Sequence, residues 1–171
     1  MVAAVGVGVG GAGCRSEGTG AGGGGPSSAC GSDQVRVAVE EAAGAGGHIG
    51  LRVRVDNPSE HGCALSGYPR VRLLDAQDRV MVTASEGNGS LTGTREPVGV
   101  VSLPPGGHAL FIVEWSDVAV ADDPCPAGVG LGITLPGARR EVLVEARSVR
   151  GLAIAPCGDR LAVSPILPAA P

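Results

Sequence analysis

From residue 34 onward, apolar side chains recur at every second position along much of the chain, which is the period of a β-strand with one buried face. In residues 49–55, Ile, Leu and two Val alternate with Gly and two Arg, and residues 35–39 repeat the pattern with three Val. Each such run is predicted to form an antiparallel strand whose apolar side faces the core. Applied to the whole chain, the pattern predicts strands at residues 35–39, 49–55, 71–73, 80–82, 98–103, 109–115, 129–135, 140–146, 151–155 and 161–164.

Turn-forming residues separate these runs. Gly44–Gly47 and Asp75–Asp78 are predicted hairpin turns, residues 104–107 are Pro-Pro-Gly-Gly, and residues 85–94 form a polar loop rich in Gly and Asn. No segment has the period of a convincing helix. Nine or ten short strands with frequent Gly and Pro turns favour an all-β fold, an antiparallel β-sandwich.

The three aromatic residues are predicted to pack rather than to bind. Tyr68 stands between Gly67 and Pro69, just after Cys63, where we expect a strand end pinned by the cysteine before the chain turns a corner. Tyr68 is the predicted packing anchor of that corner. Phe111 and Trp115 share the inward side of their strand, so core packing is favoured over a ligand platform.

The first 29 residues are predicted to carry export signals and to lie outside the folded domain. Residues 1–13 are uncharged Met, Val, Ala and Gly, which suits the apolar remnant of a signal peptide whose basic leader we expect upstream. Gly11-Ala12-Gly13-Cys14 resembles a bacterial lipobox, although that pattern prefers Leu at the position of Gly11. Cys14 is therefore the predicted lipidation site, the alternative being an ordinary secretory signal with an incidental cysteine. Residues 14–29 then form a Gly/Ser-rich tether, residues 30–166 the folded domain and residues 167–171 a Pro-rich tail.

Five cysteines leave an even set of four if Cys14 carries lipid, as disulfides in an oxidising compartment require. No pair has the Cys-x-x-Cys spacing of a zinc site. Of the three possible connectivities we favour Cys30–Cys63, because Cys30 precedes the first strand and Cys63 follows the second. Cys125–Cys157 then follows mostly by elimination, since a three-strand meander between them would place the two cysteines at opposite ends.

Charge and composition exclude one class of partner. The net charge is −4, all 13 basic residues are Arg and are scattered, and aromatic residues make up 2% of the chain. A nucleic-acid-binding protein needs a basic stripe and, for single strands, aromatic platforms. We therefore expect no nucleic-acid partner.

No catalytic motif stands out, and no cofactor, metal or catalytic residue is expected. The sequence contains neither Gly-x-Ser-x-Gly nor His-Glu-x-x-His. Asp122 and Asp123 lack the ordered carboxylates of a calcium loop, so a solvated loop is favoured. The three histidines lie in or beside predicted turns and are interpreted as solvated residues: His48, His61 and His108.

Several motifs in order resemble domain-of-unknown-function family 4232 over about residues 30–166. They are Cys30, Asn57, the run Cys63–Pro69, Leu73-Leu74-Asp75, Leu103–Ala109, Phe111 with Trp115, Cys125, Cys157-Gly158 and Val163-Ser164-Pro165. The resemblance implies an immunoglobulin-like sandwich in a secreted protein or lipoprotein of an actinobacterium. It implies no catalytic residues, because the family has no established activity.

These observations favour a non-enzymatic module of the cell envelope, anchored to the membrane through Cys14 or secreted. Its partner would be an envelope protein or polymer, bound through the longest polar loops, residues 84–97 and 116–128. Two alternatives stay open: an extracytoplasmic enzyme with a site assembled from distant residues, and a purely structural domain without a ligand.

Overall fold

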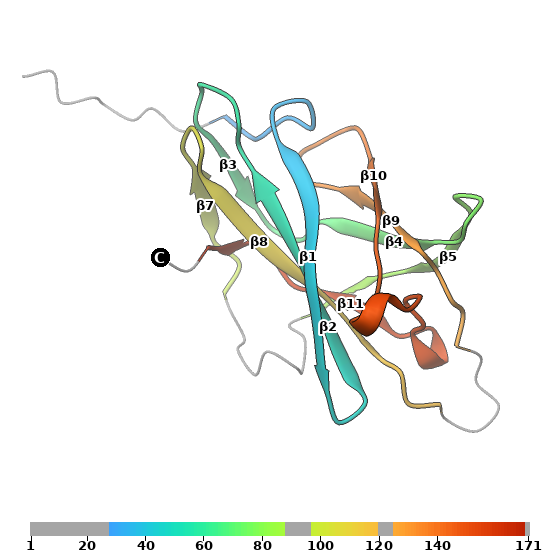
Figure 1. The fold of residues 1–171 in the computed structure, drawn as a ribbon. Helices are drawn as coiled ribbons and strands as arrows, with labels where there is room; N and C mark the ends of the chain where they lie inside the picture. The colour runs from blue at the N-terminus through green and yellow to red at the C-terminus, as the bar shows by residue number, and fades with distance from the viewer. Residues whose placement is uncertain (1–27, 88–96, 120–124, 170–171) are drawn as a thin grey trace, which may run out of the picture.

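The computed structural model describes residues 28–87, 97–119 and 125–169, which form an all-β fold of two main sheets packed face to face (Figure 1). The larger sheet has the order β1-β2-β8-β11-β6, with β12 also paired to β8. Its strands are β1 (Arg36–Ala45), β2 (His48–Asp56), β8 (His108–Ser116), β11 (Leu161–Val163), β6 (Ser85–Glu86) and β12 (Leu167–Pro168).

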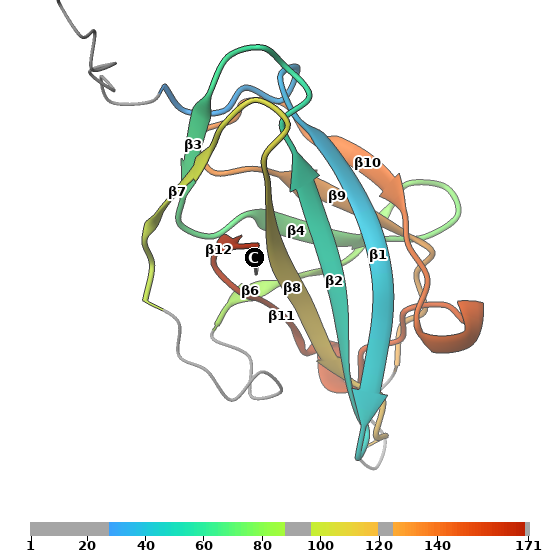
Figure 2. The ribbon, with the colours of Figure 1, turned by 60° about the vertical axis from the view of Figure 1, so that its left-hand side comes forward.

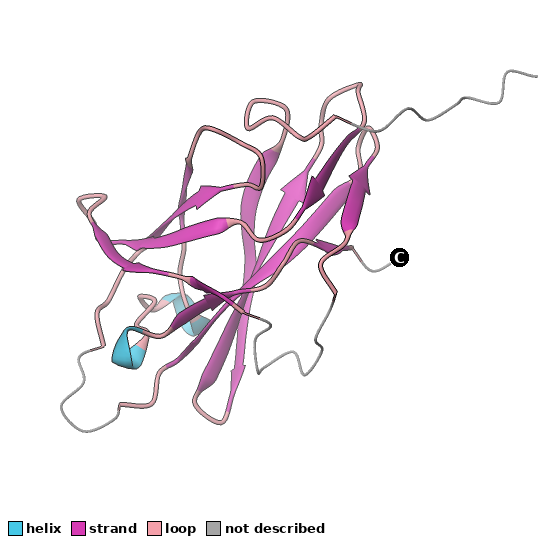
Figure 3. Cartoon of the chain, turned by 180° about the vertical axis from the view of Figure 1, so that it is seen from behind, coloured by secondary structure: helices cyan, strands magenta, loops and turns pink. Residues whose placement is uncertain are grey.

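The smaller sheet has the order β10-β9-β4-β5, and a separate two-stranded sheet joins β3 to β7. Within the described ranges the helical pieces are two single 3₁₀ turns, η1 (Val149–Gly151) and η2 (Cys157–Asp159), which Figure 3 shows in cyan. The strands of the smaller sheet and of the two-stranded sheet are β10 (Val142–Glu145), β9 (Gly130–Thr134), β4 (Arg70–Leu74), β5 (Val80–Thr83), β3 (Cys63–Ser66) and β7 (Val100–Leu103).

The centre of the larger sheet is the antiparallel pair β2 and β8, and it follows the alternation seen in the sequence. Leu51 lies opposite Val113, Val53 opposite Phe111 and Val55 opposite Ala109. All six side chains are fully buried. Burial of a large apolar side chain contributes about 1.5–3 kcal/mol, so this double row is a main source of stability.

The aromatic residues pack as expected. Phe111 is fully buried and Trp115 is 3% exposed, both in the shared core between the sheets. Tyr68 is half-buried and packs against the edge of that core. The neighbouring cysteine differs from the expectation: Cys63 is the first residue of β3, so it pins the start of a strand.

A buried asparagine organises the connections near β3. Asn57 follows β2 and is fully buried, and its amide donates hydrogen bonds to the carbonyls of His61 (2.8 Å) and Leu103 (3.0 Å). Its side-chain oxygen accepts from the Ser59 hydroxyl at 2.7 Å. A buried polar group is tolerated when it is hydrogen-bonded in this way, and here it joins two connections that are distant in sequence.

The outer face of the smaller sheet carries an ion pair above a glycine. The Arg72 guanidinium on β4 donates through Nε to Glu141 Oε1 at 2.8 Å, reaching across β9. A Cβ atom added at Gly132 would lie 2.4 Å from that same oxygen. The hydrogen bond with Glu141 raises the pKa of Arg72 above its usual value. The absence of a side chain at Gly132 therefore makes room for the pair.

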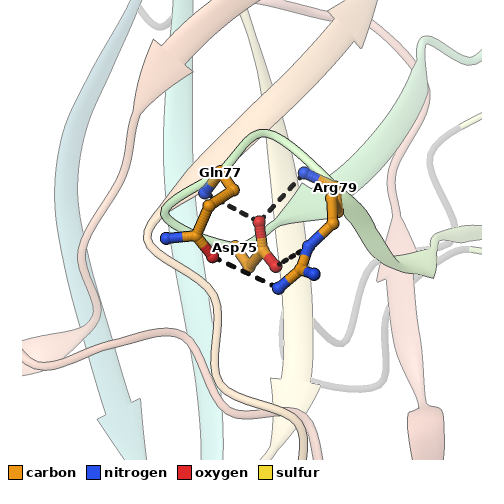
Figure 4. A network of polar contacts seen from close by, with 3 residues as sticks. All are labelled: Asp75, Gln77 and Arg79. Carbon is orange, nitrogen blue, oxygen red and sulfur yellow. Dashed lines mark hydrogen bonds and ion pairs between the residues drawn. The ribbon is translucent and has the colours of Figure 1, made fainter.

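The predicted turn after β4 is present and is held by its own side chains (Figure 4). Asp75 accepts from the backbone N–H groups of Gln77 (2.8 Å) and Arg79 (3.0 Å), and the Arg79 guanidinium donates to its other oxygen at 2.7 Å. The Arg79 backbone contact is the largest cause of a lowered Asp75 pKa. Asp78 in the same turn has φ 58°, a left-handed conformation that Asp tolerates better than most residues.

Both favoured disulfides are present, Cys30–Cys63 and Cys125–Cys157. In the first, the chain before β1 runs beside β3, where Cys30 N–H donates to the Ala64 carbonyl at 3.1 Å. The second closes because the chain between its cysteines is not a three-strand meander. β9 and β10 form a hairpin, and Ile154 returns to bridge Gly128 near its start.

The strand predicted at 151–155 is therefore wrong. Residues 149–151 form the turn η1, and Ile154 makes a single bridge with Gly128. Ile154 is fully buried, whereas Leu152 is 64% exposed. Ile154 bridges a residue just before the start of β9, and in the described part of the chain the segment 151–155 has no partner strand along its length, which explains why the alternation there does not become a strand.

Other boundaries also differ from the prediction, and the largest shift is in β1, which runs to Ala45 instead of ending at residue 39. Ser85 and Glu86 pair in parallel with β11 instead of belonging to the polar loop, and Leu167 and Pro168 pair with β8 instead of lying in a tail. The strand expected from residue 98 begins at Val100. Two-residue pairings depend on where a neighbouring strand happens to lie, which the local pattern does not encode.

Candidate ligand-binding site

The β1–β2 hairpin ends in a two-glycine turn at one end of the sandwich, as Figures 1 and 2 show from two sides. Gly46 and Gly47 have φ values of 61° and 78°, the pair of left-handed conformations that a tight hairpin turn requires. The Gly47 carbonyl accepts two hydrogen bonds, from the Asp117 N–H at 3.1 Å and from the Ser116 hydroxyl at 3.0 Å. The hairpin tip is thereby tied to the end of β8.

A hollow of about 400 Å³ opens beside this tip, and we call it the end hollow. Its walls come from three segments that are distant in sequence: residues 44–49 of the hairpin, Trp115 and Asp117 at the end of β8, and the connection 148–155. Ile49 and Trp115 supply buried apolar surface, and Leu152 is a largely exposed apolar side chain. The hollow thus combines apolar walls with few polar groups, the usual make-up of a small-molecule site.

Two oppositely charged side chains line the end hollow. Asp117 and Arg150 are both exposed, and in the described part of the chain neither side chain forms an ion pair. Among the described side chains neither charge is paired, so both can interact with a bound molecule.

Arg150 is held at the hollow by a strained turn. Its backbone has φ 60° and ψ 24°, a left-handed conformation that costs a residue with a side chain about 1–2 kcal/mol. The turn is closed by hydrogen bonds from Gly151 N–H to the Ser148 carbonyl (3.1 Å) and from Ser148 N–H to the Leu152 carbonyl (2.7 Å). Strain of this kind concentrates at functional sites, where it is retained because the geometry is useful.

A second hollow, the face hollow, lies on the outer face of β1, β2 and β8 and has a volume of about 440 Å³. Gly50 lies directly opposite Glu114, which is 5% exposed. Because Gly50 has no side chain, it leaves space beside Glu114. Arg52 lines the hollow but already faces Glu40 at 3.8 Å. The described residues contain no group of three His, Cys, Asp or Glu side chains placed to hold a metal ion.

The candidate site residues named from the sequence lie in different parts of the structure. Cys14, Asp122 and Asp123 lie outside the described residues, as do 88–96 and 120–124 of the two loops expected to bind. The described start of the second loop does reach the end hollow, through Asp117. His48 lines both hollows, whereas His61 is an exposed loop residue and His108 begins β8.

Sequence reasoning missed Arg150, because it lay at the edge of an expected strand. The available signal was Ser148-Val149-Arg150-Gly151, in which Ser and Gly three residues apart favour a turn. Nothing local in the sequence indicates that this turn faces Asp117.

A family model described as "Domain of unknown function (DUF4232)" matches residues 30–166. The chain belongs to the DUF4232 family. No curated protein and no solved structure matches it. The match begins at Cys30 and extends past Cys157, so both disulfides and the whole end hollow lie inside the DUF4232 domain. No helix in the described part of this domain is long and apolar enough to cross a membrane.

Proposed function

We propose that this protein is a non-enzymatic binding module outside the cytoplasm, attached to the membrane by lipid on Cys14. It engages a protein or polymer of the cell envelope through the end of the sandwich that carries the end hollow. The observation that carries the proposal is this hollow, which brings together two charged side chains that form no ion pair with the described residues, at one end of a disulfide-linked sandwich.

The compartment is supported by the two disulfides, because such bonds persist in oxidising surroundings and are rare in the cytoplasm. Lipid attachment would place the domain at the end of the proposed tether, which stops before Ser28, because the Ser28 carbonyl accepts from the Ala64 N–H at 2.9 Å and belongs to the folded domain. Two acyl chains give stable anchoring where one is marginal. The end hollow would then be carried by a disulfide-linked domain instead of by a free loop.

The anchor is tested by the intact mass of the natively expressed protein, with free thiols blocked and no reduction. We expect a chain that begins at an acylated Cys14, with the other four cysteines unlabelled. A mass that includes residues 1–13, or blocked thiols at the disulfide cysteines, would contradict the proposed compartment.

Binding is tested with a photocrosslinking amino acid placed at single positions of the full chain in its native host. Leu152 lies at the end hollow, and Arg139 is an exposed control in the turn between β9 and β10, at the other end of that hairpin. We expect a discrete adduct with an envelope component from position 152 and none from position 139. Equal labelling from both positions, or none from either, contradicts a binding role for this end.

A further inference from the structure

The end hollow has a charge arrangement that specifies a class of ligand. We propose that it binds a small zwitterion with an apolar side chain, either a free amino acid or a short peptide with both ends free. The carboxylate of the ligand lies against Arg150, its ammonium group lies against Asp117, and its apolar part rests against Leu152. This inference goes beyond the proposed function, because it assigns a small ligand, and not only an envelope partner, to the same hollow.

Arg150 suits the carboxylate. Its guanidinium is permanently charged and presents donors in a planar fork that matches two carboxylate oxygens. In the described residues it has no carboxylate partner, in contrast to Arg72 and Arg79, which are held by Glu141 and Asp75. The left-handed backbone at Arg150 supplies a second, independent observation, because a strained residue at a hollow marks a place where position is maintained at a cost.

Asp117 sets the other half of the selectivity. Its backbone N–H is bound to Gly47, and one carboxylate oxygen lies close to that same glycine, so the side chain stands at the rim of the hollow. A carboxylate there attracts an ammonium group and repels a second negative charge, while Arg150 repels a second positive charge. The pair therefore disfavours dicarboxylates and diamines, and selects molecules that carry one charge of each sign.

The walls select for an apolar portion of the ligand. Leu152 is 64% exposed, and Ile49 and Trp115 are buried apolar residues of the lining. A ligand side chain that covers Leu152 removes apolar surface from water on both partners, which favours binding. The hollow volume of about 400 Å³ lies within the range of small-molecule sites, about 300–1,000 Å³.

The test is an amide-resolved NMR titration of the full chain with L-alanyl-L-leucine, its N-acetyl form and its C-terminal amide. We expect saturable shifts at Gly47, Asp117 and Gly151 for the free dipeptide, with a dissociation constant of about 1 mM because both charges are exposed. Each blocked form loses one charge-assisted contact and should bind roughly tenfold more weakly. Titration with free L-leucine separates the two sources: equal or tighter binding indicates an amino acid, and weaker binding indicates a peptide.

Arg150→Asn is the informative variant, because Asn tolerates the left-handed backbone while removing the guanidinium. It should fold normally and lose dipeptide binding by roughly tenfold, whereas Arg140→Asn in the β9–β10 turn should bind as the parent does. Equal affinity for all three dipeptide forms, unchanged binding by Arg150→Asn, or no saturable shift overturns the zwitterion assignment. If crosslinking at position 152 still succeeds in that case, the proposed binding role stands and only the ligand class is wrong.

Discussion

The backbone N–H of Asp117 donates to the carbonyl of Gly47 at 3.1 Å, and together with the Ser116 hydroxyl it joins the end of β8 to the tip of the β1–β2 hairpin. It fixes two of the three segments that line the end hollow relative to each other. Gly47 can accept the hydrogen bond because the turn points its carbonyl toward β8. By donating that hydrogen bond, Asp117 is held with its carboxylate at the rim of the hollow. The candidate site is therefore a consequence of how the hairpin closes.

The two turn glycines should respond differently to substitution. Gly46→Ala and Gly47→Ala each force an alanine into a left-handed backbone, which should cost about 1–2 kcal/mol in the free energy of unfolding, measured with urea. A Cβ at Gly46 meets nothing within 4 Å, whereas one at Gly47 would lie 2.1 Å from a methyl group of Val118. Only Gly47→Ala should therefore shift the amide signals of Asp117 and Val118, and an equal shift in both variants would contradict this packing.

Removing the two disulfides should cost similar stability but have different local effects. Their cysteines are 33 and 32 residues apart, so each removal should lower the free energy of unfolding by about 3–4 kcal/mol in the chain-entropy model. The double variant Cys125→Ala/Cys157→Ala should also speed amide hydrogen exchange at Ser148 and Leu152, because Cys157 anchors that connection. Cys30→Ala/Cys63→Ala is the matched control, and faster exchange of those amides in the control would contradict the assignment.

Gly132 should be far less tolerant than its neighbour two residues away on β9. A Cβ at Gly132 would lie 2.4 Å from Glu141 Oε1, while one at Gly130 has no neighbour closer than 3.5 Å. Gly132→Ala should displace the Arg72–Glu141 pair and lower the free energy of unfolding by about 1–2 kcal/mol, with Gly130→Ala near neutral. In a Glu141→Ala background the cost of Gly132→Ala should shrink. An unchanged cost there would show that the ion pair is not the reason.

The Asp75 turn should make stability depend on acid pH. The pKa of Asp75 is lowered in the folded protein, chiefly by the Arg79 backbone N–H, so the folded state favours the ionised carboxylate. The resulting stabilisation is present above the ordinary Asp pKa of about 3.9 and is lost as the pH falls through the lower folded value. The stability difference between the parent and Asp75→Asn, measured by urea unfolding, should be constant near neutral pH and shrink below about pH 4. Glu60→Gln, at an exposed loop position, serves as the control. If the stability difference between the parent and Asp75→Asn grew on acidification, it would contradict a lowered pKa of Asp75 in the folded protein.

The sequence alone predicts the main strands and the pairing of the disulfides. Alternation over residues 49–55 and 109–115 predicts the central pair, because each of these strands has one side facing a common core. Setting Cys14 aside leaves an even number of cysteines. That count and the positions of the cysteines around the first hairpin predict the observed pairing. These inferences work because they depend on local pattern and on simple counting.

The site was not predictable in the same way. Residues 151–155 alternate like a strand, yet among them only Ile154 forms a β-bridge, to Gly128 just before the start of β9. The end hollow joins the hairpin tip, the end of β8 and the η1 turn, and no local pattern indicates that Asp117 and Arg150 line one space. Such proximity is a product of tertiary packing.

The most direct test of the proposed binding end is hydrogen exchange of the full chain, followed by mass spectrometry, with and without solubilised envelope material from the native host. We expect slower exchange in residues 44–49, 115–118 and 148–155, and no change in residues 135–141 at the far end of the β9–β10 hairpin. The same protection should be absent in Arg150→Asn. Protection confined to residues 135–141, or none anywhere, would contradict the assignment of function to the end hollow.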